Sequence, residues 1–149
     1  MSWIDNCPLP WTGPTCDTLL TLPVNRSWGF RAPLPQDQNI SSWGGSVLFD
    51  DASAAAGDDP WHMFAAEMVG NCGIDYWEPN SQIVHATAKT PEGPYTKRDV
   101  VLPPFAHEPN AVRGPNGEWI IYATVRNPNG YPTYDCSGPS GARLHATPP

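Results

Sequence analysis

Residues 61–102 read WHMFAAEMVGNCGIDYWEPNSQIVHATAKTPEGPYTKRDVVL, and this stretch decides the fold. It contains three short strand candidates, at 61–68, 81–87 and 95–102, and Gly, Pro or Asp residues separate each from the next. Short runs of apolar, aromatic and β-branched residues that are bounded by turn residues are typical of β-strands. The stretch therefore predicts three successive strands that pair as an antiparallel meander.

The neighbouring residues extend this meander in both directions. Residues 45–49 form an apolar strand candidate upstream, and the small and polar residues 50–60 predict a turn between it and the next strand. Two further strand candidates follow downstream, at 110–113 and 118–125, joined by a turn that contains Asn-Gly, a strong hairpin signal. Four successive antiparallel strands are the unit of a β-propeller blade.

The order of strand, turn and aromatic strand thus occurs twice, at 45–68 and at 110–125. Repetition at such a distance is typical of folds built from radially arranged units. We expect an all-β chain, a partial β-propeller of about one and a half four-stranded blades. A β-sandwich or a plain meander has the same composition and remains the alternative.

The composition favours a folded chain over a disordered one. Pro (19) and Gly (13) together exceed a fifth of the 149 residues, which is also a feature of disordered segments. Seven Trp, five Tyr and four Phe argue for burial, because aromatic side chains bring large apolar areas into a core. We therefore expect a folded β-rich centre with loose ends.

Charge and hydropathy exclude two classes of partner. The net charge of −7 and the pI near 4.8 argue against nucleic acid, since phosphate binding needs clustered Lys and Arg. The sequence has no apolar run of the roughly 20 residues that a membrane span needs. The N-terminus MSWIDNCPLPW lacks a basic region followed by an apolar one, so we predict no signal peptide in this chain.

Cysteines and sequons nevertheless indicate a secreted or extracellular protein. Four cysteines allow two disulfides in three connectivities, and no C-x-x-C pattern suggests zinc. Asn25 and Asn39 each begin an Asn-x-Ser glycosylation sequon. A truncated or wrongly started chain would reconcile these features with the missing signal peptide.

Residues 7–16, CPLPWTGPTC, resemble the last loop of an EGF-like module. Two cysteines enclose eight residues, and the aromatic Trp11 is followed two positions later by Gly13. The resemblance implies a Cys7–Cys16 disulfide and an EGF-like stub at residues 1–16. A cysteine pair that merely closes a small loop is the alternative. Residues 17–42, rich in proline and polar residues, are then expected to be a linker.

More specific motifs stand in the strand region. NSQIVHA at 80–86, followed by PEGPY at 91–95, resembles the outer part of a blade in the five-bladed propeller glycosidases of family 43 type. FAHEPN at 105–110, followed by GEWIIY at 117–122, is similar to the start of their next blade. We therefore expect a partial five-bladed propeller at residues 43–135, with a tail at 136–149.

With that arrangement, a Cys72–Cys136 disulfide would tie the end of the first blade to a loop of the second. Together with Cys7–Cys16 it would use all four thiols of the chain. We predict this second disulfide, which intact-mass measurement of free thiols would test.

The resemblance implies a central funnel that binds a sugar chain and carries acidic groups from several blades. Glycoside hydrolysis needs two carboxyl groups on opposite sides of the bond that breaks. The Asp that opens the first blade of the family is missing, because residues 41–46 read SSWGGS. Five blades of roughly 40–50 residues also exceed this chain. We expect no hydrolysis from this chain alone.

Glu108 and His107 are the leading site candidates, since they precede Pro109 at the entry of a predicted inner strand. Glu108 would be the catalytic carboxylate, and His107 would bind the sugar by a hydrogen bond. The alternative is a turn that Pro109 shapes, with Glu108 in solvent.

Three further residues are candidate sugar contacts, each with a structural alternative. Trp43, before Gly44 and Gly45, would stack on a sugar ring or lie in the core. Glu67 would line the rim of the site or be buried with a partner. Asn80 would bind sugar hydroxyls or cap a turn. His85 fits a packed strand position better than a ligand, and His62 gives no signal.

Carbohydrate is therefore the predicted partner, and a glycosidase-like propeller is the first functional hypothesis. A non-catalytic carbohydrate-binding or adhesion protein is the second, and a gene fragment without function is the third. Some propellers of the family hold a calcium ion in the channel, which makes His107 a candidate calcium contact. No other metal or cofactor is predicted.

Overall fold

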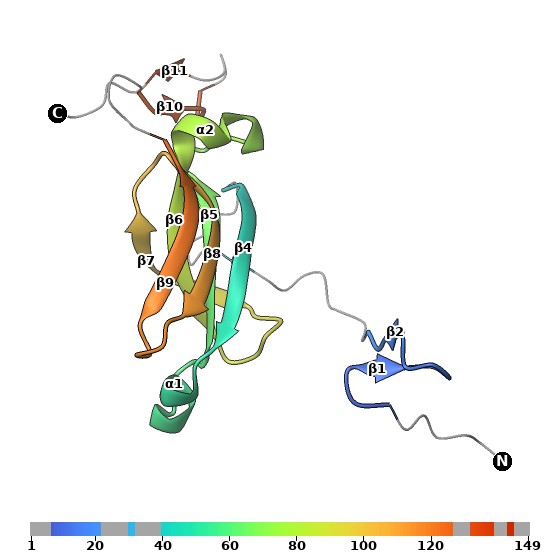
Figure 1. The fold of residues 1–149 in the computed structure, drawn as a ribbon. Helices are drawn as coiled ribbons and strands as arrows, with labels where there is room; N and C mark the ends of the chain where they lie inside the picture. Colours follow the sequence, from blue (N-terminus) through green and yellow to red (C-terminus); the bar gives the residue numbers. More distant parts are fainter. Residues whose placement is uncertain (1–6, 22–29, 32–39, 127–131, 139–142, 145–149) are drawn as a thin grey trace.

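A computed structural model describes residues 7–21, 30–31, 40–126, 132–138 and 143–144. The chain is mostly β, as the sequence predicts, and none of its described sheets closes on itself (Figure 1). In chain order the elements are β1 (Trp11–Thr12), β2 (Thr18–Leu19), β3 (Phe30–Arg31), β4 (Ser42–Phe49), α1 (Asp51–Ala56), β5 (Trp61–Met68), the 3-10 helix η2 (Ile74–Tyr76), α2 (Trp77–Asn80), β6 (Ser81–Ala88), β7 (Tyr95–Leu102), β8 (Ala106–Arg113), β9 (Trp119–Val125), β10 (Tyr134–Asp135) and β11 (Arg143–Leu144).

The main sheet has five strands in the order β3-β7-β6-β5-β4. Strands β4 to β7 form the antiparallel meander that the sequence predicts, and each lies within a few residues of its predicted bounds. The two-residue strand β3 adds to the outer edge by pairing in parallel with β7. Strand β3 belongs to residues 17–42, which were expected to be a linker.

Strand alternation gives the sheet two apolar faces. On one face Trp61 and Met63 of β5 pack against a buried cluster of Ala86, Ala88 and Tyr95. On the other face β8 lies against β4, β5 and β6, and β8 and β9 form a separate antiparallel hairpin (Figure 1). Buried apolar side chains therefore lie on one face of the sheet and, on its other face, between the sheet and this hairpin.

The turn predicted at 50–60 is wrong in part, because helix α1 occupies residues 51–56. Asp50 caps the helix by accepting a hydrogen bond from the backbone N–H of Ser53, and Gly57 ends it with a left-handed φ of 81°. Asp before the first turn and Gly after the last are strong helix boundaries. An alanine-rich segment between two such residues has the propensity to complete a short helix.

The strand predicted at 110–113 begins four residues earlier than expected, at Ala106. The register between β8 and β9 shifts between His107 and Asn110, and this bulge includes Pro109. A proline cannot donate a ladder hydrogen bond, so a bulge is where a strand tolerates it.

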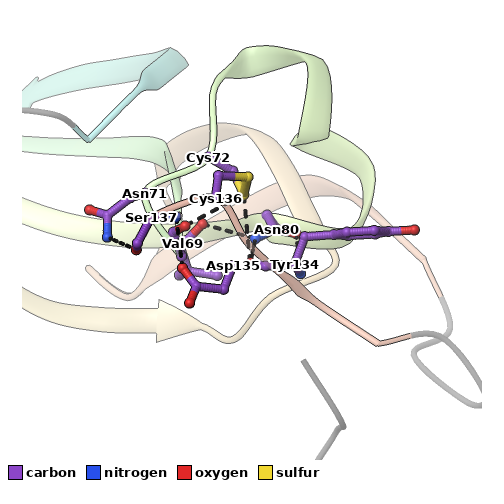
Figure 2. The surroundings of a disulfide bond; sticks show 9 residues. Val69, Asn71, Cys72, Asn80, Tyr134, Asp135, Cys136 and Ser137 are labelled. Carbon is purple, nitrogen blue, oxygen red and sulfur yellow. Dashed lines mark hydrogen bonds between the residues drawn. A yellow bond between two sulfur atoms is a disulfide. The ribbon is translucent and has the colours of Figure 1, made fainter. Parts of the chain in front are cut away.

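Both predicted disulfides are confirmed. Cys7 pairs with Cys16 across β1, and Cys72 pairs with Cys136, which ties the loop after β5 to the segment that follows β10 (Figure 2). Two disulfides are consistent with an extracellular protein, because thiols stay reduced in the cytosol. The sequons at Asn25 and Asn39 lie outside the described residues.

None of the helices in the described part of the chain has the length and apolar character needed to cross a membrane.

Candidate functional site

The predicted site residues gather at one end of the main sheet, where α2 lies. Strands β4, β6 and β8 begin at this end, and β5 and β9 finish there (Figure 1). The candidate residues lie at these strand ends: Trp43 in β4, Glu67 in β5, Asn80 before β6, and His107 and Glu108 in β8. The topology thus brings together residues that are up to 65 positions apart in sequence.

Strands β4 and β8 both carry a bulge at this end, and the two bulges face each other. The β4 register shifts between Trp43 and Gly45, and the β8 register shifts between His107 and Asn110. A Cβ placed on Gly44 would lie 3.6 Å from Cγ of Glu108. The missing side chain at Gly44 therefore allows Glu108 to lie directly against β4.

Glu108 has a left-handed backbone, with a φ of 50°, and its side chain is exposed. Such a conformation is uncommon for a residue other than glycine and often marks a functional position. Trp43 is also exposed, at 57% of its surface. These two residues are accessible to a ligand, as their predicted roles require.

His107 is buried and held in place. Its Nδ1 lies 2.7 Å from the Ser81 hydroxyl, and its ring centroid lies 5.0 Å from that of Trp77. Burial lowers the pKa of His107, against a smaller opposing effect of the Glu108 carboxylate. The imidazole is thus fixed in orientation and favours its neutral form, in which one ring nitrogen donates and the other accepts.

The lowered pKa of His107 predicts a loss of stability in acid. Its neutral form contributes stability above the ordinary pKa of about 6.5, and that stability is lost as pH falls through the lower folded-state pKa. Between pH 7 and pH 5 we expect wild type to lose more unfolding free energy than His107→Gln. Urea unfolding at both pH values measures this; equal losses in the two proteins would contradict it.

Two adjoining pockets, with volumes of about 520 and 310 Å³, open at this end of the sheet, and His107 lines the smaller one. Their walls share an aromatic and charged set: Trp77, Glu78, Phe105 and Arg126. The larger pocket adds the tyrosines Tyr76 and Tyr134, together with Asp75, Pro79 and Pro132. The smaller one adds His107 and Thr124. Ligand sites commonly combine such aromatic walls with a few polar groups.

Glu78 and Arg126 form an ion pair at the boundary between the pockets. Arg126 also donates its backbone N–H to the carbonyl of Phe105, at 2.9 Å, so the end of β9 is tied to the start of β8. Sequence reasoning missed Arg126, Tyr76 and Tyr134 as site residues. Phe105 and His107 carried a signal, as members of the FAHEPN motif, whereas the contacts of Arg126, Tyr76 and Tyr134 depend on chain segments far apart.

Asn80 is fully buried, and its polar atoms are used within the protein (Figure 2). Its Nδ2 donates to the carbonyls of Val69 and Tyr134, and its Oδ1 accepts from the Tyr134 N–H. The amide therefore stabilises the docking of β10 onto the sheet. No atom of Asn80 is accessible to a ligand in the described structure.

Glu67 is buried as well, with 2% of its surface exposed. Its Oε1 accepts hydrogen bonds from Gln82 Nε2 and Lys97 Nζ, each at 2.7 Å. These partners lie on β6 and β7, so Glu67 connects three strands of the sheet. Of the five predicted site residues, Trp43, His107 and Glu108 remain candidates for ligand contact.

Among the residues that the structure describes, no group of three His, Cys, Asp or Glu side chains is placed to hold a metal ion. His107 faces Ser81 and Trp77 instead of a second ligand.

Searches against protein-family models, curated proteins and solved structures returned no match to this chain.

Proposed function

We propose that this chain is part of a β-propeller that binds carbohydrate at the α2 end of its main sheet. The two adjoining pockets are the observation that carries the proposal. Trp77, Tyr76 and Tyr134 provide flat apolar faces, which suit the C–H face of a sugar ring. The Glu78–Arg126 pair provides acceptors and donors for hydroxyl groups at the same place.

The relation between the two sheets supports a propeller. Strand β4, the first strand of the four-stranded meander and an edge strand of its sheet, and β8, the first strand of the hairpin, run in the same direction and lie side by side (Figure 1). The N–H of Ala111 in β8 donates to the Ser46 hydroxyl of β4, at 2.8 Å. Neighbouring blades of a propeller place their first strands in this way around a central channel. The β8–β9 hairpin then corresponds to the first half of a second blade.

Hydrolysis is the second candidate function, and the position of Glu108 favours it. Its exposed carboxylate lies beside Gly44, at the level where the resembled glycosidases open their first blade with an Asp. A glycosidase needs a second carboxyl group about 5–9.5 Å away. Since residues 41–46 carry none, that group would come from another segment.

Replacing Trp77 by alanine tests the binding site. We expect at least a tenfold loss of affinity for a glycan that the wild type binds, because Trp77 borders both pockets. Tyr122→Ala is the matched control, since Tyr122 is exposed on β9 and does not line either pocket. A glycan array followed by titration of the best ligand measures both variants.

The proposal fails if the wild type binds no glycan, or if the Trp77→Ala and Tyr122→Ala variants bind equally well. Glu108→Gln then separates the two candidate functions. A hydrolase would lose turnover while keeping its affinity, whereas a binding protein would show no turnover in either form.

A further inference from the structure

Four side-chain contacts form a hydrogen-bond chain that crosses the sheet on the side of α1, away from the candidate site. Asp99 Oδ2 lies 3.0 Å from His85 Nδ1, and His85 Nε2 lies 2.8 Å from His62 Nδ1. His62 Nε2 lies 3.2 Å from the Ser53 hydroxyl, which donates to Asp50 Oδ2 at 2.7 Å. The chain therefore has a carboxyl group at each end and two imidazoles and a hydroxyl between them.

Counting protons in this chain gives its charge. Each of the four contacts needs one proton to be a hydrogen bond. Two neutral imidazoles and one hydroxyl supply only three protons, because a neutral imidazole carries one N–H. With both carboxyl groups ionised, all four hydrogen bonds exist together only when the two histidines carry one additional proton between them.

With that proton three of the bond directions are fixed, and the His62–His85 bond runs from whichever ring carries the positive charge. When the charge is on His85, that ring donates from both nitrogens, to Asp99 and to Nδ1 of His62. His62 donates from Nε2 to Ser53, and the Ser53 proton points to Asp50. The shorter distance from Ser53 to Asp50 than to His62 agrees with this direction.

The charged groups around the histidine pair act in both directions. Asp50 and Asp99 lie at the two ends of the hydrogen-bond chain. The charges of Asp50 and of Asp59, from the segment between α1 and β5, act to raise the pKa of His62. Arg113 of β8 opposes them, and the facing rings of Phe64 and Trp119 carry no charge. Burial and the neighbouring His85 lower the pKa of His62, which agrees with a neutral His62 beside a charged His85.

The chain also reaches the second sheet. Asp50 forms an ion pair with Arg113 of β8, whose guanidinium lies 3.5 Å from the ring centroid of Trp119 in β9. Trp119 in turn packs against His62, with ring centroids 5.2 Å apart. The hydrogen-bond chain thus connects β5, β6, β7 and α1 to the β8–β9 hairpin.

We infer that His62 and His85 share one additional proton between Asp99 and Asp50, and that this proton clamps the β8–β9 hairpin to the main sheet. Loss of the proton removes one of the four hydrogen bonds. Addition of a second proton breaks the His62–His85 bond, because two imidazolium rings have no acceptor between them.

Long-range ¹H–¹⁵N spectra of the imidazole rings test the proton count directly. At pH 6 we expect both ring nitrogens of His85 to carry protons and His62 to carry a proton on Nε2 only. Two neutral rings that both carry the Nδ1 proton would overturn the inference, since the Ser53 hydroxyl would then donate to His62. His107, which contacts Ser81 and lies outside the hydrogen-bond chain, serves as a reference histidine in the same spectra.

A stability measurement tests the clamp. Asp99→Asn removes the charge at one end, and we expect the folding equilibrium constant to fall about threefold at pH 6, the size expected for a largely exposed charged pair. At pH 8 the loss should be much smaller, because a neutral histidine pair makes no charged hydrogen bond to Asp99. Asp58→Asn is the matched control, an exposed aspartate near α1 whose carboxylate forms no hydrogen bond or ion pair within the described residues.

A loss that is the same at pH 6 and pH 8, or no greater than that of the Asp58→Asn control, would overturn the clamp. Because each variant is compared with wild type at the same pH, the other titrating groups cancel.

Discussion

Replacement of Cys72 and Cys136 together by serine is expected to lower the unfolding free energy by about 4 kcal/mol. The disulfide joins residues 64 positions apart, so its removal restores much conformational freedom to the unfolded chain. It also holds β10 against the sheet, where Asn80 is fully buried and binds Tyr134. Denaturant unfolding of the two proteins, followed by tryptophan fluorescence, gives the difference.

The Cys7–Cys16 disulfide provides the matched comparison. Its loop spans only 9 positions and encloses β1, which pairs with β2 in a sheet of their own. Replacing this pair by serine should therefore lower the unfolding free energy of the main sheet by less than about 1 kcal/mol, similar to the effect of an ordinary surface substitution. Equal losses in the two double variants would contradict the assignment of Cys72–Cys136 as the main covalent support.

The strands were predictable because their signal is local. Residues 61–68, 81–87 and 95–102 are strands within one residue of their predicted bounds, since apolar runs between turn residues depend on neighbours in sequence. Helix α1 was missed although Asp50 and Gly57 were its boundary signals. A six-residue helix has too few residues for a helical period to stand out from a polar turn.

The position of the candidate site at one end of the sheet was predictable, but the contacts of its individual residues were not. Motifs pointed to the end of the sheet where His107 and Glu108 lie, because strand order determines which ends meet. The partners of each polar residue depend on long-range packing, such as the 54 positions between Asn80 and Tyr134. Sequence spacing gave no means to distinguish a buried Asn80 from an exposed Glu108 at the same end.

Glu67 shows what a carboxylate buried at that end of the sheet requires. A buried carboxylate is tolerated only with a partner that replaces water. Lys97 supplies this for Glu67 from β7, with only 26% of its side chain exposed, while Gln82 donates from β6. Glu67 Oε2 is buried without a hydrogen-bond partner in the described structure, so the carboxylate depends on the contacts to Oε1.

Lys97→Met is therefore expected to lower the unfolding free energy by about 3–5 kcal/mol, because it leaves the Glu67 charge buried and unpaired. The double variant Glu67→Gln with Lys97→Met should recover most of this loss, since an amide at 67 still accepts from Gln82 without a charge. Urea unfolding of the single and double variants at pH 7 measures the recovery.

Arg98→Met is the control for this prediction, because the Arg98–Asp59 pair is more exposed, with 48% of the arginine side chain accessible. Exposed pairs contribute about 0–1 kcal/mol, so this variant should lose little stability. If Lys97→Met lost no more than Arg98→Met, Glu67 would not be carrying a buried charge. If the double variant were as unstable as Lys97→Met, packing of the lysine stem and not the charge would be the main contribution of Lys97 to the fold.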